Sequence, residues 1–225
     1  MATVKVVSII SRAQTLLKDA SGARWPVLEL QLWLNDSYRE IVTLHPDANA
    51  EVGTFVCAAG YRQTLETNYP YAYKVLEVLN NSAATSNKKF VKLVSKRSMD
   101  SMVPDWYNQT ASVNIEKYMY DQRVPKDFLV YPPATTAARL EIIYSAVPQP
   151  HTLTEAQLQN AATAEVIRLD DIYGSPILDY ILYRAYTKDS EQPNNAARAA
   201  AHYQAMVTSL NFKVQSDESV APGSS

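Results

Sequence analysis

The sequence predicts an α+β protein: a four-helix bundle made from N- and C-terminal helical hairpins, with an antiparallel β-domain inserted between them. Two observations predict this class. Apolar residues recur at the spacing of one helix face in both terminal parts of the chain. The middle of the chain instead holds short β-branched and aromatic runs, which turn residues and prolines separate.

The N-terminal part, residues 1–50, is expected to form the first helical hairpin. One helix covers residues 3–18, where aliphatic side chains fall on one face. Pro26 opens a second helix, because proline is favoured in the first helical turn. The pair His45-Pro46 ends that helix, because a residue before proline avoids the helical conformation.

The middle part, residues 51–168, is expected to form the inserted β-domain. Pro132 and Pro133 exclude a helix from one of its segments. The most apolar and β-branched runs are residues 73–79 and 139–146. The candidate strands are residues 53–58, 61–65, 73–79, 90–95, 113–120, 128–131 and 139–146.

The C-terminal part, residues 169–213, is expected to form the second hairpin. Ser175-Pro176 has the capping hydroxyl and the proline that begin a helix. The helix over residues 177–187 is apolar or aromatic nearly all round, so more than one neighbour should bury it. A polar loop ending in proline separates it from a helix over residues 195–210.

Composition excludes several classes of protein. A formal net charge of −2 argues against a general nucleic-acid binder. Cys57 is the single cysteine, so internal disulfides and cysteine-based zinc sites are excluded. Its neighbours are apolar, which favours a small buried side chain over a nucleophile. We find no run of membrane-spanning length and no signal peptide, so we expect folding in a reducing cytoplasm without a membrane.

The sequence offers no site for catalysis, a metal or a cofactor. His45, His151 and His202 lie at no metal-ligand spacing from one another or from the cysteine. No Ser/His/Asp arrangement follows from the spacing, and glycines do not cluster. Asp170 and Asp171 could act as paired carboxylates, but acidic residues before a helix more often stabilise its dipole. We therefore expect no enzyme and no cofactor.

One basic cluster comprises Lys88, Lys89, Lys92, Lys96 and Arg97. On a strand, Lys92 and Lys96 would share a face and could touch nucleic-acid phosphates. Lysines on a solvated face, or guarding an edge strand against aggregation, explain the cluster equally well. We favour the second reading and expect little contribution to DNA binding.

The 15 tyrosines are the unusual feature of the composition, because tyrosine suits surfaces that meet partners. Those of the C-terminal hairpin could belong to the core or to a contact between subunits, and both readings stay open. The subunit-interface candidates are Trp33, Tyr38, Tyr180, Tyr183 and Tyr186.

Short motifs in a fixed order resemble a known family over nearly the whole chain, to about residue 210. They are Arg24-Trp25-Pro26, Trp33-Leu34-Asn35-Asp36, Arg39-Glu40-Ile41-Val42, Pro46-Asp47-Ala48, Gly53-Thr54-Phe55, Pro104-Asp105-Trp106, Tyr120-Asp121, Pro125, Phe128, Tyr131-Pro132-Pro133, Pro148, Pro176, Asp179, Tyr180, Tyr183, Ala185, Lys188-Asp189-Ser190, Ala196-Ala197-Arg198-Ala199 and Tyr203. The chain resembles the adaptors of tailed bacteriophages, the head-to-tail connectors also called head-completion or tail tubular A-like proteins. Residues 58–71 and the chain after residue 211 follow no part of this pattern.

The resemblance implies a structural role in the virion. Such adaptors form a ring, usually of twelve subunits, at the head–tail interface, after assembly in the host cytoplasm. The ring bridges the portal protein to the tail nozzle protein, and DNA passes through its lumen without sequence-specific binding. The resemblance implies that the helical bundle packs beside its ring neighbours and that the β-domain faces the tail.

The last residues, 214–225, are polar and small, which predicts an extended tail that is disordered when free in water. A partner would have to hold such a tail in place, and the portal or a neighbouring subunit is the natural candidate. The portal-contact candidates are Val214, Gln215, Val220 and Pro222.

The alternative function is a tail-associated glycan hydrolase or a carbohydrate-binding module. A hydrolase needs two carboxylates facing one cleft, and Glu116 and Asp121 are the candidates. A carbohydrate-binding module would need tyrosines exposed on the β-domain.

Overall fold

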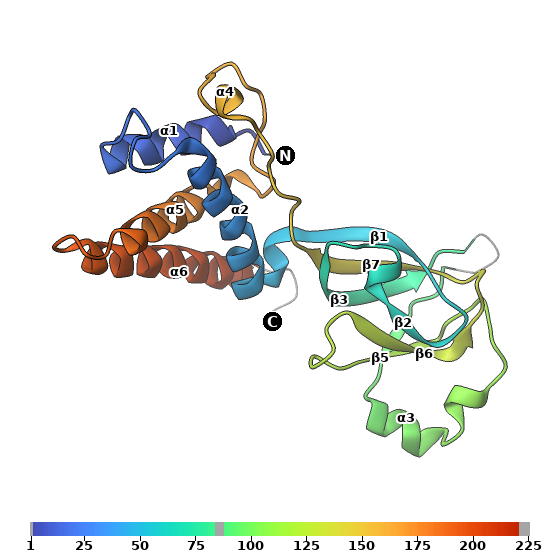
Figure 1. Ribbon diagram of the computed structural model, residues 1–225. Coiled ribbons are helices and arrows are strands. Elements are labelled where there is room, and N and C mark those ends of the chain that lie inside the picture. The colour runs from blue at the N-terminus through green and yellow to red at the C-terminus, as the bar shows by residue number, and fades with distance from the viewer. Residues whose placement is uncertain (1, 84–87, 221–225) are drawn as a thin grey trace. The chain divides into compact units, whose positions relative to one another are not determined.

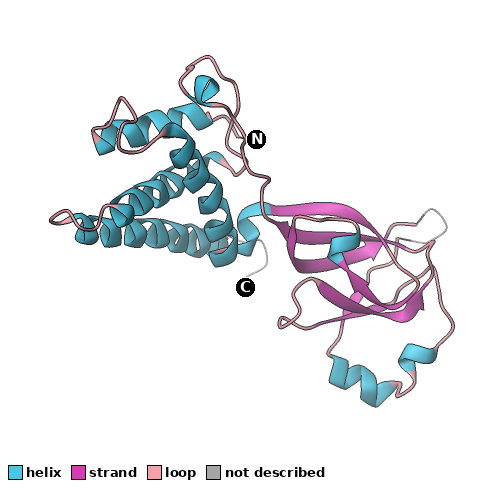
Figure 2. Cartoon of the chain, viewed as in Figure 1, coloured by secondary structure: helices cyan, strands magenta, loops and turns pink. Residues whose placement is uncertain are grey.

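The computed structural model describes residues 2–83 and 88–220, with side chains through residue 212 (Figure 1). The chain divides into two compact units. The helical unit comprises Met1–Ala48 and Pro148–Ser225, and the β unit comprises Asn49–Val147. Residues 148–168, which the sequence assigns to the inserted domain, therefore lie in the helical unit. Figure 2 shows that helices dominate the first unit and strands the second.

The helical unit is built around the C-terminal pair of helices, which run side by side (Figure 1). Buried aliphatic and aromatic side chains from all its longer helices form one core. Its helices are α1 (Val6–Leu17), α2 (Val27–Leu44), α4 (Glu155–Leu158), α5 (Gly174–Lys188) and α6 (Asn195–Val220), with a 3₁₀ turn at Asp171–Tyr173.

Hydrogen bonds to one carboxylate shape the loop between α1 and α2. Lys18 ends α1 in a left-handed conformation with φ 55°, which turns the chain. The Asp19 carboxylate then accepts backbone N–H bonds from Ala23, Arg24 and Trp25 at 2.8–3.1 Å. These bonds hold the pKa of Asp19 below its usual value. The loop is thus fixed in the direction that starts α2 after Pro26.

The expected four-helix bundle made from two terminal hairpins is wrong. The class is α+β, with six α-helices and seven strands in two sheets over the described residues. Helices α1 and α2 make few contacts with each other, and both pack against α5. Only α5 and α6 form an extensive helix pair.

Two amides of α2 explain why the bundle does not form. The Asn35 side chain accepts from the His151 backbone N–H at 2.8 Å and donates to its carbonyl at 3.0 Å. Gln31, one turn earlier, makes the same pair of bonds with Leu153, at 2.9 and 3.2 Å. A connecting segment therefore covers the face of α2 on which a bundle would place another helix.

The β unit holds two sheets whose inner faces share one hydrophobic core. The strands are β1 (Ala50–Val56), β2 (Gly60–Thr64), β3 (Ala72–Asn81), β4 (Lys92–Leu93), β5 (Lys117–Tyr120), β6 (Asp127–Ala134) and β7 (Arg139–Ala146). The first sheet has the order β1-β7-β3 and the second β2-β6-β5-β4, with all pairs antiparallel except β4 with β5. Phe55 and Phe128 meet edge to face across the core, with ring centroids 5.3 Å apart.

An extended segment, residues 89–94, links the two sheets on one side. The Asn81 N–H donates to the Lys89 carbonyl, and the Val91 N–H donates to the Leu79 carbonyl, so this segment first pairs with β3. It then pairs with β5, where the Val94 N–H donates to Tyr118. Helix α3 (Lys96–Met102), which no sequence pattern predicts, follows directly.

The C-terminal end differs from the expected extended tail. Helix α6 continues to Val220, so residues 214–220 are helical and the prediction of an extended conformation for them is wrong. Of the portal-contact candidates, Val214, Gln215 and Val220 therefore lie on α6, and Pro222 lies outside the described residues.

Candidate assembly interface

A buried polar chain in the helical unit is its most enzyme-like feature. His151 Nδ1 lies 2.8 Å from the Glu165 carboxylate, and its Nε2 lies 2.9 Å from the Tyr38 hydroxyl. Because a carboxylate only accepts, Nδ1 carries the hydrogen and the Tyr38 hydroxyl donates to Nε2. The same hydroxyl accepts the backbone N–H of Arg168 at 3.0 Å. Burial lowers the pKa of His151 and raises that of Tyr38 to about 12.

This chain is placed for structure and not for reaction with a substrate. The His151 side chain is fully buried and Tyr38 has no exposed surface. The bonds tie the segment after β7 to α2 and to the backbone before α5. Across the part of the chain that the structure describes, no three His, Cys, Asp or Glu residues gather as metal ligands.

Asp171 and Cys57 also have structural surroundings. The Asp171 carboxylate accepts the Thr3 N–H and hydroxyl at 2.7 and 2.6 Å and the Val4 N–H at 2.9 Å, so it ties the N-terminal residues to the start of α5. Asp170 accepts the Ile172 N–H as a helix cap. Burial raises the pKa of the Cys57 thiol to about 12, so the thiolate is absent at neutral pH.

The aromatic interface candidates mostly pack within one chain. Trp33, Tyr38 and Tyr180 are buried in the core of the helical unit, so their side chains are not accessible to another subunit in this structure. Tyr183 and Tyr186 are half-buried between α5 and α6. The rings of Tyr183 and Tyr203 lie 5.0 Å apart, and the Tyr186 ring stacks on His202 at 5.7 Å. The Tyr203 hydroxyl reaches α2, where it donates to Glu40 at 2.9 Å.

The exposed apolar side chains of the helical unit include two neighbouring leucines of α2. Leu28 and Leu32 are 43% and 60% exposed and stand one turn apart. Sequence reasoning did not select them, because they lie off the main apolar face of this helix. The spacing of two leucines at i and i+4 beside that face was the feature of the sequence that could have indicated this exposed pair.

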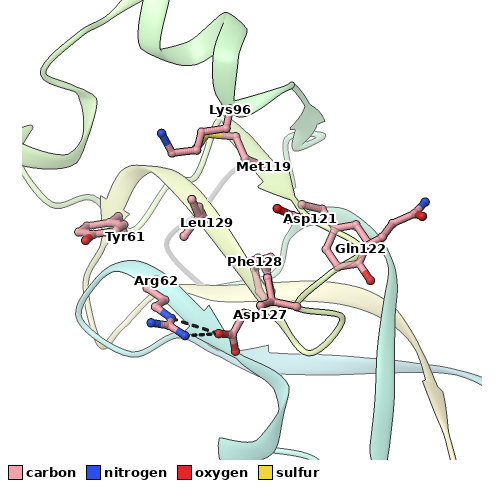
Figure 3. Close-up of a pocket in the computed structure, with 11 residues that line it drawn as sticks. Tyr61, Arg62, Lys96, Met119, Asp121, Gln122, Asp127, Phe128 and Leu129 are labelled. Atoms are coloured by element: carbon pink, nitrogen blue, oxygen red, sulfur yellow. Dashed lines mark hydrogen bonds and ion pairs between the residues drawn. The ribbon is translucent and has the colours of Figure 1, made fainter.

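The β unit has a pocket of about 530 Å³ on the outer face of its second sheet (Figure 3). Met99 of α3 and Trp106 pack on Met119 and cover part of this face. The rest is open, with Leu129 and Met119 among the lining side chains and Tyr61 at one side.

The charged groups around this pocket form ion pairs. Arg62 bonds to Asp127, as the dashed lines of Figure 3 show, and Lys96 contacts Asp100 at 2.7 Å. Asp121 contacts Arg123 at 2.6 Å, and these bonds lower the pKa of its carboxyl to about 2. A carboxyl with so low a pKa is ionised at neutral pH and cannot act as a general acid there.

The two carboxylates proposed for a glycan hydrolase do not share this site. Asp121 lines the pocket, whereas Glu116 is exposed and is not among the lining residues. A pair of carboxylates flanking one bond is what such hydrolysis requires. The pocket therefore combines apolar lining groups with charged groups that are held in ion pairs.

The comparisons with known proteins assign the chain to a family. No curated protein matches it. No described helix is both long and apolar enough to cross a membrane. The family described as SU10 adaptor protein matches residues 4–224, which is almost the whole chain. The protein therefore belongs to the SU10 adaptor protein family, and it is a structural adaptor of a bacteriophage.

Proposed function

We propose that this adaptor assembles into a ring, of twelve subunits as is usual in the family that it resembles. The ring joins the portal protein to the tail nozzle protein at the head–tail interface of the virion and lets DNA pass without sequence-specific binding. It forms in the host cytoplasm during assembly, and the protein belongs to the head-completion, tail tubular A-like group. It has no catalytic role.

The exposed leucine pair of α2 is the observation that supports this proposal. Leu28 and Leu32 place two large aliphatic side chains on the water-facing side of a helix whose other face is already buried. Burying such a side chain contributes roughly 1.5–3 kcal/mol, which favours contact with a neighbouring subunit.

A closed ring also needs a second, different surface, because each subunit contacts its two neighbours through unlike patches. The outer edges of Tyr183 and Tyr186 on α5 are the second surface that we propose. Both rings keep accessible area after packing against α6.

The C-terminal end of α6 is the proposed portal contact. Phe212 is 68% exposed on this helix, and Val214, Gln215 and Val220 follow on its last turns. We propose that these residues and Pro222 meet the portal. A helix presents such a contact more rigidly than an extended tail, so less conformational entropy is lost on binding.

The test of ring formation uses a variant of the leucine pair. The double substitution Leu28→Ser and Leu32→Ser should keep the melting temperature of the monomer, since both side chains are exposed. It should strongly reduce co-sedimentation with portal-containing capsids, because each subunit would lose the contact with its neighbour and be held by its portal contact alone. The matched control is Leu44→Ser, which changes a leucine 39% exposed near the end of the same helix. If the double variant co-sedimented with capsids as fully as the unchanged protein, the proposal that this face of α2 contacts a neighbouring subunit would be refuted.

A further inference from the structure

The segment over residues 88–92, together with Lys117, has an arrangement of charge that folding alone does not explain. Val91 is completely buried in the core of the β unit, and the backbone around it pairs with β3 on one side and β5 on the other. The flanking side chains Phe90 and Lys92 are exposed, as alternation along an extended chain requires. The segment is thus an extended stretch held by backbone hydrogen bonds, in which Val91 faces the core while Phe90 and Lys92 face water.

Like charges stand directly opposite each other on that face. Lys92 pairs in register with Lys117 of β5, so both side chains leave the same side of the sheet. The Lys117 ammonium lies 5.4 Å from the centroid of the Tyr131 ring. Glu116 precedes Lys117 and points to the opposite face. Two cations in such a cross-strand pair destabilise the sheet.

The surrounding basic residues do not have acidic partners either. Among residues 2–83 and 88–212, Lys96 is paired with Asp100, whereas no ion pair is formed by Lys88, Lys89, Lys92, Arg97 or Lys117. Lysines that guard an edge strand would account for part of this charge. They do not account for Phe90, which lies between Lys89 and Lys92 in the sequence and is 67% exposed.

An exposed aromatic side chain next to cations that form no ion pair is typical of a surface that a partner covers. We propose that Phe90, Lys92 and Lys117, with Lys88 and Lys89 beside them, bind an acidic segment of a partner protein that carries a bulky apolar side chain. The acidic groups neutralise the facing lysines, and the apolar side chain covers Phe90. This inference adds the chemistry of one partner to the proposed adaptor function. It rests on that function only in assigning the segment to a virion protein.

A DNA duplex fits this surface less well. Its backbone offers phosphates to the lysines but nothing that buries an aromatic ring. The net charge of −2 also gives the whole protein no long-range attraction for DNA. Binding of duplex DNA is therefore the competing outcome that the experiment has to separate.

The test measures binding by the purified full-length protein of a labelled peptide in which glutamates alternate with leucines. The two comparison probes are the same peptide with glutamines in place of glutamates, and a short DNA duplex. The acidic peptide should bind, the glutamine peptide should not, and added salt should weaken the binding. Lys92→Glu should weaken the binding of the acidic peptide about tenfold or more, because a charge that repels the peptide's glutamates replaces one that attracts them.

Matched controls separate the surface from general effects. Arg12→Glu makes the same change of net charge at an exposed arginine of the helical unit and should leave peptide binding unchanged. Phe90→Ser should weaken binding, whereas Phe212→Ser, at an equally exposed phenylalanine, should not. Lys92→Glu should also raise the melting temperature, because it removes the like-charge pair with Lys117.

Two results would overturn the inference. One is tighter binding of the DNA duplex than of the peptide, with dependence on Lys92 but none on Phe90. The other is a peptide affinity that neither variant of the surface changes. Since the assay needs no ring, it can fail while ring formation succeeds, and the reverse also holds.

Discussion

Gly53 is a position of the β unit at which one added methyl group has no room. A Cβ atom there would lie 2.4 Å from the Tyr69 hydroxyl oxygen and 3.3 Å from the Tyr144 ring. The two rings stack 4.2 Å apart, and the Tyr144 hydroxyl donates to Glu51 at 2.7 Å, so neither ring moves freely. Gly53→Ala should therefore cost roughly 1–3 kcal/mol of the free energy of unfolding, measured by urea denaturation.

The matched control for this substitution is Gly174→Ala. Gly174 has helical φ and ψ of −58° and −38°, and an added Cβ would meet its nearest atom at 3.9 Å. Alanine there should leave stability unchanged or raise it. Equal effects at Gly53 and Gly174 would mean that the ring pair yields to the methyl group.

His151 should make the stability of the helical unit depend on pH. Burial lowers the pKa of this imidazole below 6.5, although the Glu165 carboxylate opposes the shift. Above pH 6.5 the imidazole is neutral in both states, and below it the unfolded chain takes up a proton that the folded chain does not. The free energy of unfolding should therefore fall as the pH drops through 6.5. Urea denaturation at neutral pH and about one unit below 6.5 measures this loss.

The variant His151→Gln separates this residue from other titrating groups. Glutamine can still hydrogen-bond but does not titrate, so the loss of stability over that pH range should shrink. Glu165 and Arg168, which also contact this site, stay in place in the variant. The lowered pKa of Glu165 adds a second loss of stability only at lower pH, below its ordinary value of 4.5. An unchanged pH profile in the variant would contradict the assignment to His151.

At the scale of elements, periodicity predicts the long helices well. Helix α5 begins at Gly174, close to the expected start at Ser175-Pro176, and its buried Ile177, Ile181 and Ala185 belong to the predicted face. Its apolar surface does exceed what one neighbour covers, because α1, α2 and α6 all pack on it. The sequence could show that α5 is central without showing how its neighbours are arranged.

The arrangement was not predictable because polar side chains decide it. Gln31 and Asn35 on α2 would ordinarily be assigned to a solvent-facing position, yet both are buried against the backbone of a distant segment. Helix α3 was missed because the candidate strand over residues 90–95 runs up to its first residue, and no helical spacing follows it. The local sequence pattern carries no information on which distant backbone segment a side-chain amide will form hydrogen bonds with.

The candidate interface shows the same limit. The excess of tyrosine indicated a surface for partners, but Tyr180, Tyr183 and Tyr203 pack against one another between α5 and α6 of one chain. Leu28 and Leu32 are among the apolar residues that stay exposed. An apolar side chain at helical spacing is assigned to the core by default. Only the packed structure distinguishes the side chains that are buried from those that stay exposed.

At the scale of the whole molecule, the hydrophobic cores of the two units are separate and share no side chain among the residues that the structure describes. Only two chain segments connect them, at residues 48–49 and 147–148. Cooperativity between parts of a protein depends on shared packing, so we expect each unit to unfold in its own transition.

A pair of substitutions tests this independence. Phe128→Ala removes a fully buried ring from the β unit and should lower its stability by roughly 3–5 kcal/mol, and Ile181→Ala should lower that of the helical unit by roughly 2–5 kcal/mol. Hydrogen exchange read by mass spectrometry reports on each unit separately. Each substitution should speed exchange in its own unit and leave the other unchanged. If Phe128→Ala sped exchange equally in α5, the two cores would unfold as one, and the expected independence of the two units would be wrong.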